Sequence, residues 1–82
     1  MAYTGDQRKL LREFGRRVRE AREARDWTQE DLAAEVGVDR TYIGGVERGE
    51  RNLGLYNINR IALALDESFA DLLPFRAGRR RR

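Results

Sequence analysis

Apolar residues recur every three or four positions along most of this chain, which is the period of helices with one buried face. No stretch of useful length alternates apolar and polar residues in the manner of a strand. A first helix is predicted over 6–25, with the apolar stripe Leu10, Leu11, Phe14, Val18 and Ala21. A fourth helix is predicted after a loop over 49–54, with the stripe Leu55, Ile58, Ile61, Ala62 and Leu65. The pattern therefore predicts an all-α fold.

Capping residues mark a short second helix over 29–36. Thr28 stands where an N-cap hydroxyl is needed, and Asp31 occupies the third helical position of a capping box. Gly37 follows the last apolar residue, where a left-handed conformation ends a helix. These local signals predict both ends of the helix.

The same signals repeat two residues later. Asp39 is a predicted N-cap for a third helix over 40–48, which Gly49 ends. Two short helices joined by a few residues, with a glycine at the bend, are typical of a helix-turn-helix.

A fifth helix is predicted near the C-terminus. Ser68 is its N-cap, Pro74 ends it, and its apolar residues are Phe69, Leu72 and Leu73. The domain is therefore predicted over 1–75. The tail over 76–82 contains five arginines and little apolar surface, so we expect it to be disordered.

Composition limits the possible functions. The chain has 82 residues, which is enough for one domain, and it contains no cysteine and no histidine. Its only lysine is Lys9, so no catalytic constellation or metal site can be assembled and no cofactor or small-molecule ligand is expected. No apolar run reaches the roughly 20 residues of a membrane span, and no signal segment is evident. We expect a cytoplasmic protein that is not an enzyme.

The charge distribution refines this picture. The net charge is +3, but the tail holds five of the 17 basic residues, which leaves 12 basic and 14 acidic residues in 1–75. The predicted domain is not basic in bulk, so any case for nucleic acid must rest on where its arginines lie.

The segment 27–52, WTQEDLAAEVGVDRTYIGGVERGERN, resembles the helix-turn-helix family of lambda-type (XRE-like) phage repressors. The likeness extends over roughly residues 10–73. Within that family, DRTYIGGVERGERN is most similar to the small controller proteins of restriction–modification systems. The resemblance implies a compact five-helix, lambda-repressor-like domain that binds double-stranded DNA as a homodimer and regulates transcription. Gly44 and Gly45 stand where many relatives carry a polar base-reading side chain.

The face of the third helix opposite Ile43 and Val46 supplies the candidate DNA contacts. The candidate base contacts are Arg40, Thr41, Gly44 and Gly45. Arg40 has the donor geometry for guanine, and the two glycines could let the backbone approach DNA closely. The alternative for Arg40 is that it is an ordinary solvated arginine. The alternative for the two glycines is that they only weaken the helix locally.

Candidate phosphate contacts flank this surface. They are Gln29, Tyr42, Arg48, Arg51 and Asn52. Gln29 lies in the first helical turn, where free N–H groups attract anions. The resemblance places Arg51 and Asn52 near the DNA backbone. Asn52 could instead bond its own loop.

Two charged residues fall on inward faces. Arg22 lies one turn after Val18, and Glu47 lies one turn after Ile43. An isolated buried charge is costly, so we predict that they form a buried, bidentate ion pair. The alternative is that both reach solvent past their aliphatic stems.

The C-terminal region contains more large apolar residues than one small core needs. We predict that some of them form a homodimer interface, the candidates being Tyr56, Phe69, Leu72, Leu73 and Phe75. A purely intramolecular core is the alternative. Two other functions also remain open at this point, an antitoxin that represses its own operon and binds a toxin, and a helical protein-interaction module.

Overall fold

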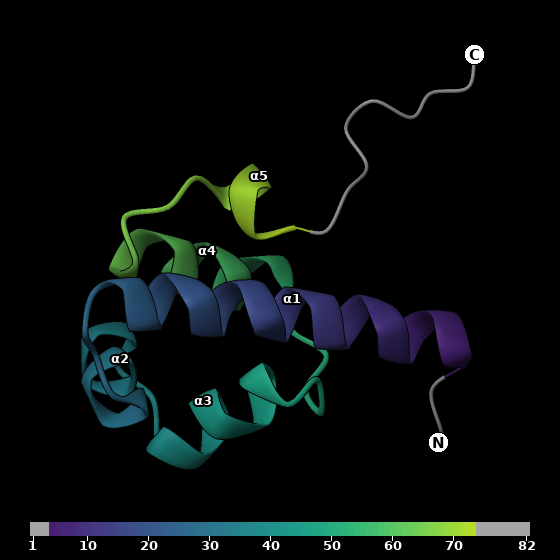
Figure 1. Ribbon diagram of the computed structural model, residues 1–82, viewed down its shortest axis with the longest axis horizontal. Coiled ribbons are helices and arrows are strands. Elements are labelled where there is room, and N and C mark those ends of the chain that lie inside the picture. The colour runs from purple at the N-terminus through teal and green to yellow at the C-terminus, as the bar shows by residue number, and fades with distance from the viewer. Residues whose placement is uncertain (1–3, 74–82) are drawn as a thin grey trace.

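The computed structural model describes residues 4–73, and within that range it has five helices. They are α1 (Gly5–Ala24), α2 (Gln29–Val36), α3 (Arg40–Glu47), α4 (Leu55–Ala64) and α5 (Phe69–Leu72). No described residue is in a strand. In Figure 1, α1 runs between two groups of helices, with α2 and α3 on one side and α4 and α5 on the other. The predicted all-α class and order of helices are confirmed. Phe75 and the 76–82 tail lie outside the described residues.

The helix ends follow the capping signals of the sequence. Thr28 and Asp31 form the predicted capping box, with Asp31 N donating to Thr28 Oγ1 over 3.0 Å. Gly37 has a φ of 87°, the left-handed conformation that ends α2. α1 starts one residue earlier than predicted because Thr4 and Gln7 form a second capping box.

The core lies where the five helices come together, with α1 packed on α3 and α5, and α2 packed on α3 and α4. Its fully buried members are Val18, Leu32, Ile43, Val46, Ile61, Leu65 and Leu72. Two residues of the predicted stripes do not belong to it. Leu10 is 50% exposed because the N-terminal part of α1 extends beyond the other helices (Figure 1). Leu55 is 74% exposed because α4 meets the core only from Ile58 onward.

Two glycines allow backbone contact between α1 and the C-terminal end of α3. A β-carbon on Gly15 would lie 2.6 Å from the Glu47 carbonyl oxygen. Gly49 has a φ of 77°, and a β-carbon there would lie 2.8 Å from Arg12 Cα. Such distances are sterically forbidden, so α3 can sit this close to α1 only because both positions lack side chains.

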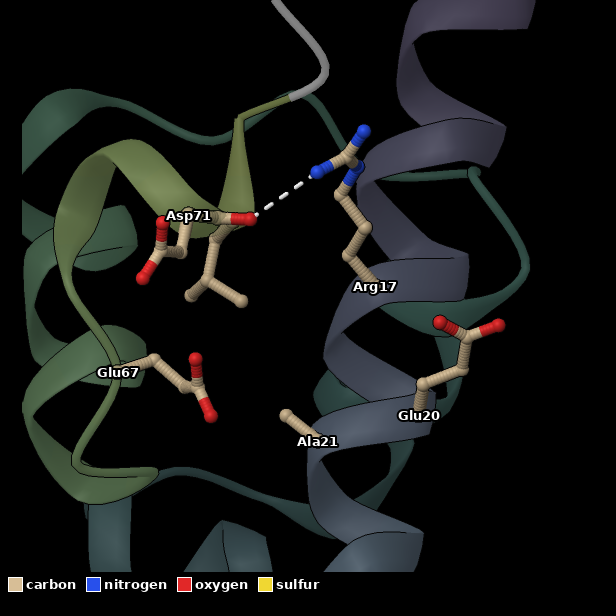
Figure 2. A pocket seen from close by; sticks show the side chains of 6 residues that line it. Arg17, Glu20, Ala21, Glu67 and Asp71 are labelled. Carbon is tan, nitrogen blue, oxygen red and sulfur yellow. Dashed lines mark hydrogen bonds between the residues drawn. The ribbon is translucent and has the colours of Figure 1, made fainter.

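α5 is tied to α1 from the opposite side. Arg17 Nη1 donates to the Asp71 carbonyl oxygen over 3.2 Å (Figure 2). The same residues border a hollow of about 300 Å³ that also involves Glu20, Ala21 and Glu67. In Figure 1, α1 lies between α5 and α3.

Candidate nucleic-acid interface

α2 and α3 are joined through Gly37, Val38 and Asp39, which makes the bend of the helix-turn-helix. Gly37 N and Val38 N both donate to the Ala33 carbonyl oxygen, over 2.8 and 3.0 Å. Arg60 of α4 donates to the Val36 carbonyl oxygen and so caps the C-terminal end of α2. The bend is therefore fixed by local turn chemistry and by one distant arginine.

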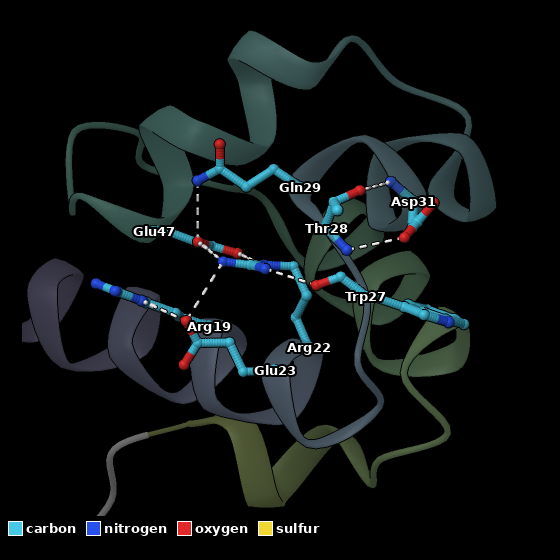
Figure 3. Close-up of polar contacts among 8 residues, drawn as sticks. All are labelled: Arg19, Arg22, Glu23, Trp27, Thr28, Gln29, Asp31 and Glu47. Atoms are coloured by element: carbon cyan, nitrogen blue, oxygen red, sulfur yellow. Dashed lines mark hydrogen bonds and ion pairs between the residues drawn. The ribbon is translucent and has the colours of Figure 1, made fainter.

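The predicted ion pair between Arg22 and Glu47 is present (Figure 3). Arg22 Nε donates to Glu47 Oε2 over 2.7 Å, and Nη2 donates to Oε1 over 3.0 Å. The Arg22 side chain is 10% exposed and that of Glu47 is 4% exposed. The hydrogen bond that Arg22 donates to Glu47 raises the pKa of Arg22, against the opposing effect of burial. This planar pair connects the end of α1 to the end of α3.

Further donors surround the pair (Figure 3). Arg22 Nη1 donates to the Trp27 carbonyl oxygen over 2.7 Å. This bond attaches the linker before α2 to the ion pair. Gln29 Nε2 donates to Glu47 Oε1 over 3.1 Å. One amide hydrogen of Gln29 is therefore committed to the ion pair. Its second amide hydrogen is the one that could reach a phosphate.

The first turn of α3 exposes the two candidate base-reading side chains. Arg40 and Thr41 are both exposed. The Thr41 hydroxyl donates to the Asp39 carboxylate, and Thr41 N donates to Asp39 Oδ2 over 3.3 Å. The hydroxyl bond is the main reason why the pKa of Asp39 is lowered. The cap thus fixes the Thr41 side chain and leaves the Arg40 side chain projecting from the helix start.

Gly44 and Gly45 are not a bare strip of backbone. Both are buried, and arginine side chains cover them. A β-carbon on Gly44 would lie 3.1 Å from Arg48 Nη1, and one on Gly45 would lie 3.2 Å from Arg51 Cγ. The side chains of Arg48 and Arg51 therefore lie over the two glycines, and close approach of this backbone to DNA stays a prediction.

The remaining phosphate candidates lie in three different environments. Arg51 Cζ lies 5.2 Å from the centroid of the Tyr42 ring, so these two side chains are in cation–π contact. Arg48 Nη2 pairs with Glu50 Oε1 over 3.1 Å, which raises the pKa of Arg48 and lowers that of Glu50. Asn52 lines an apolar hollow of about 190 Å³ near Leu10, Phe14 and Ile58.

Sequence reasoning missed Glu50 and Arg60. The signal for Glu50 was present, since opposite charges flank the glycine that ends α3. Arg60 lies 24 residues after Val36, and no local pattern could link the two.

The predicted dimer residues differ in exposure. Tyr56 is 75% exposed, and Phe69 and Leu73 are half-buried. Leu72 is 2% exposed and belongs to the core of the single chain, so its assignment to an interface is corrected. The sequence did not identify Leu10, Leu55 and Leu63 as surface residues, yet each is at least half exposed.

Comparison with known proteins identifies the arrangement. A family model described as helix-turn-helix matches residues 18–72. Control protein C.BamHI of Bacillus amyloliquefaciens is 46% identical over 63 residues, which cover 76% of this chain and 78% of that protein. This chain belongs to the helix-turn-helix family of control proteins. Members of this family are DNA-binding transcription regulators, and the chain is one of them.

Solved structures of other helix-turn-helix control proteins share the fold. The restriction–modification controller protein C.AhdI from Aeromonas hydrophila is 51% identical, with a TM-score of 0.74, over 77% of this chain and 96% of its own. The controller protein C.Esp1396I, solved as a tetramer in complex with its natural 35 base-pair operator, is 36% identical, with a TM-score of 0.71, over 77% and 83%. No helix within residues 4–73 is long and apolar enough to cross a membrane.

Proposed function

We propose that this chain binds palindromic operators in double-stranded DNA as a homodimer, with α3 in the major groove. The observation that carries the proposal is the division of α3 into two faces. Ile43 and Val46 are fully buried, while Arg40 and Thr41 project away from the core at the N-terminal end of the helix. A helix that reads bases needs exposed polar side chains at that end and a firmly anchored inner face.

In this proposal, the roles around α3 follow from the contacts of each side chain. Arg40 reads a guanine through its two parallel donors, and Thr41 contacts a base edge or a thymine methyl group. Gln29, Tyr42, Arg48, Arg51 and Asn52 approach phosphates. The relatives' names support regulation over catalysis, and a regulator of this kind works in the cytoplasm, where its operator lies.

The homodimer is supported by the apolar surface left exposed on the single chain. Leu55, Tyr56 and Leu63 of α4 are each more than 70% exposed. Together with Phe69 and Leu73, they give a second copy a surface to cover. A two-fold dimer would present its two copies of α3 about 34 Å apart, which is one turn of DNA.

The test is selection of duplexes from a random pool by the purified protein, followed by sequencing. We expect an enriched inverted repeat with half-site centres about 10 base pairs apart. Arg40→Ala should remove the preference at one base pair in each half-site and weaken specific binding by about 1–3 kcal/mol. Absence of any enriched sequence would contradict the proposal. Enrichment of a single half-site would contradict the dimer alone.

A further inference from the structure

Gly45 has an unexpected neighbour for a residue on the outer face of a short helix. It is buried, and the atoms that would meet a β-carbon there are Arg51 Cγ at 3.2 Å and Arg51 Nε at 3.3 Å. Arg51 itself is an exposed residue of the loop that follows α3. Its side chain therefore folds back along the helix and covers the glycine.

The tip of the same side chain lies against an aromatic ring. Arg51 Cζ is 5.2 Å from the Tyr42 ring centroid, within the range of a cation–π contact. Tyr42 and Gly45 are three residues apart, so they are neighbours on one face of α3. The Arg51 side chain thus lies on the helix backbone with its stem and over the ring with its guanidinium.

We propose that Gly45 is a positioning residue for DNA recognition, because its missing side chain lets Arg51 lie flat along α3 with its guanidinium over Tyr42. The inference rests on the proposed function and assigns the roles of three residues within it. Stacking uses the face of the guanidinium and leaves its N–H edge free to meet a guanine or a phosphate. An arginine held in this way loses less side-chain freedom on binding than a free one.

Gly44 provides an internal comparison in the same helix. The nearest atom to its β-carbon position is Arg48 Nη1, at the far end of a side chain that is 61% exposed. That end can move away without disturbing the rest of Arg48. At Gly45 the tight contacts fall on the middle of the Arg51 side chain, so its stem and its guanidinium must shift together by a few tenths of an ångström.

The experiment measures operator affinity and Tm for Gly45→Ala, Gly45→Leu and Gly44→Ala. Alanine favours a helix over glycine, so both alanine variants should keep or raise the Tm, by up to roughly 4–8 °C. Gly45→Ala should nevertheless bind the operator about two- to fivefold more weakly, the size of an exposed cation–π contact. Gly45→Leu should bind more weakly still, and Gly44→Ala should bind like the wild type.

A double-mutant cycle assigns the loss to Arg51. Arg51→Ala should lower operator affinity, and adding Gly45→Ala to Arg51→Ala should cause no further loss. If the two losses add, Gly45 does not act through Arg51 and the proposal is wrong. A fall in Tm parallel to the fall in affinity would equally overturn it.

A measurement without DNA separates this proposal from the proposed function. In the free protein, the Arg51 Nε–H resonance should show the ring current of Tyr42 and should lose it in Gly45→Ala and in Tyr42→Leu. An Arg51 resonance at the position of a freely mobile arginine in the wild type would overturn the arrangement. Wild-type protein that shows the ring current but selects no DNA would instead refute the proposed function.

Discussion

Gly15 of α1 and Glu47 of α3 meet backbone to backbone, since a β-carbon on Gly15 would lie 2.6 Å from the Glu47 carbonyl oxygen. The same turn of α3 carries the Glu47 carboxylate that pairs with Arg22. The distance between the two helices therefore sets the geometry of the ion pair as well as the packing of the core.

Gly15→Ala should lower the free energy of unfolding although alanine is the better helix former. The methyl group cannot be accommodated unless α1 and α3 move apart, and overpacking of this kind costs about 1–3 kcal/mol. Thermal unfolding measures the effect. Gly5→Ala is the matched control, because a β-carbon at Gly5 meets nothing within 4 Å. Equal Tm values for the two variants would contradict the close contact.

Breaking the Arg22–Glu47 pair from one side should destabilise the fold by about 3–5 kcal/mol, because it leaves a buried charge unpaired. Glu47→Gln leaves the Arg22 guanidinium without its carboxylate partner, although it retains its bond to the Trp27 carbonyl oxygen. Arg22→Met leaves the Glu47 carboxylate unpaired and loses that bond as well, so it should be the less stable of the two single variants. The double variant Arg22→Met/Glu47→Leu should recover much of the loss. Chemical denaturation of all three decides this, and simple additivity would show that the residues are not coupled.

Glu50→Gln should increase affinity for DNA of any sequence. The Glu50 carboxylate lies 3.1 Å from Arg48 Nη2 and competes with phosphate for that guanidinium. If Arg48 gains a phosphate, the plot of log K against log salt should steepen by about 0.9 per subunit. Glu67→Gln makes the same charge change on the far side of α1 and should leave the slope unchanged. An identical slope in both variants would exclude Arg48 as a phosphate contact.

Asp26→Gly and Asp66→Gly should each stabilise the protein, by up to about 1 kcal/mol. Both aspartates adopt the left-handed conformation directly after a helix, with φ of 59° and 55°. Glycine adopts that conformation without the steric cost of a β-carbon, and it removes a negative charge from the negative end of the helix dipole. The measurement is thermal unfolding. A decrease in Tm would mean that these carboxylates have a stabilising contact of their own.

The N-cap of α3 should weaken in acid. Bonds from Thr41 lower the pKa of Asp39, so the cap contributes stability above the unfolded aspartate pKa of about 3.9. That contribution is lost as the pH falls through the lower folded value. Amide exchange at Thr41 should accelerate over this pH window. In Asp39→Asn, which keeps an acceptor but cannot titrate there, the acceleration should be absent.

The parts of the fold that the sequence predicted are those set by neighbours in the chain. The ends of α2 follow from Thr28, Asp31 and Gly37, all of which act within one turn. The Arg22–Glu47 pair could also be predicted, because an unpaired charge on the inward face of a small domain is costly and each of these two residues supplies the other's partner.

The parts that could not be predicted depend on distances between helices. Periodicity shows that Leu10 and Leu55 are apolar, but not how far α1 and α4 extend past the core. Glycine composition does not reveal that Gly15 contacts another backbone or that Gly45 is covered by Arg51. The capping of α2 by Arg60 likewise depends on where α4 passes.

The two-faced construction of α3 has a consequence for how such regulators diverge. Ile43, Val46 and Glu47 determine whether the helix stays in place, whereas Arg40 and Thr41 contribute nothing to the core. Substitutions at Arg40 are therefore nearly neutral for folding, and those at Thr41 lose only its side-chain bond to the Asp39 cap. After a gene duplication, two copies could acquire different operators without first becoming unstable. The regulatory repertoire of this fold can expand by changing a few side chains on a helix that is anchored from behind.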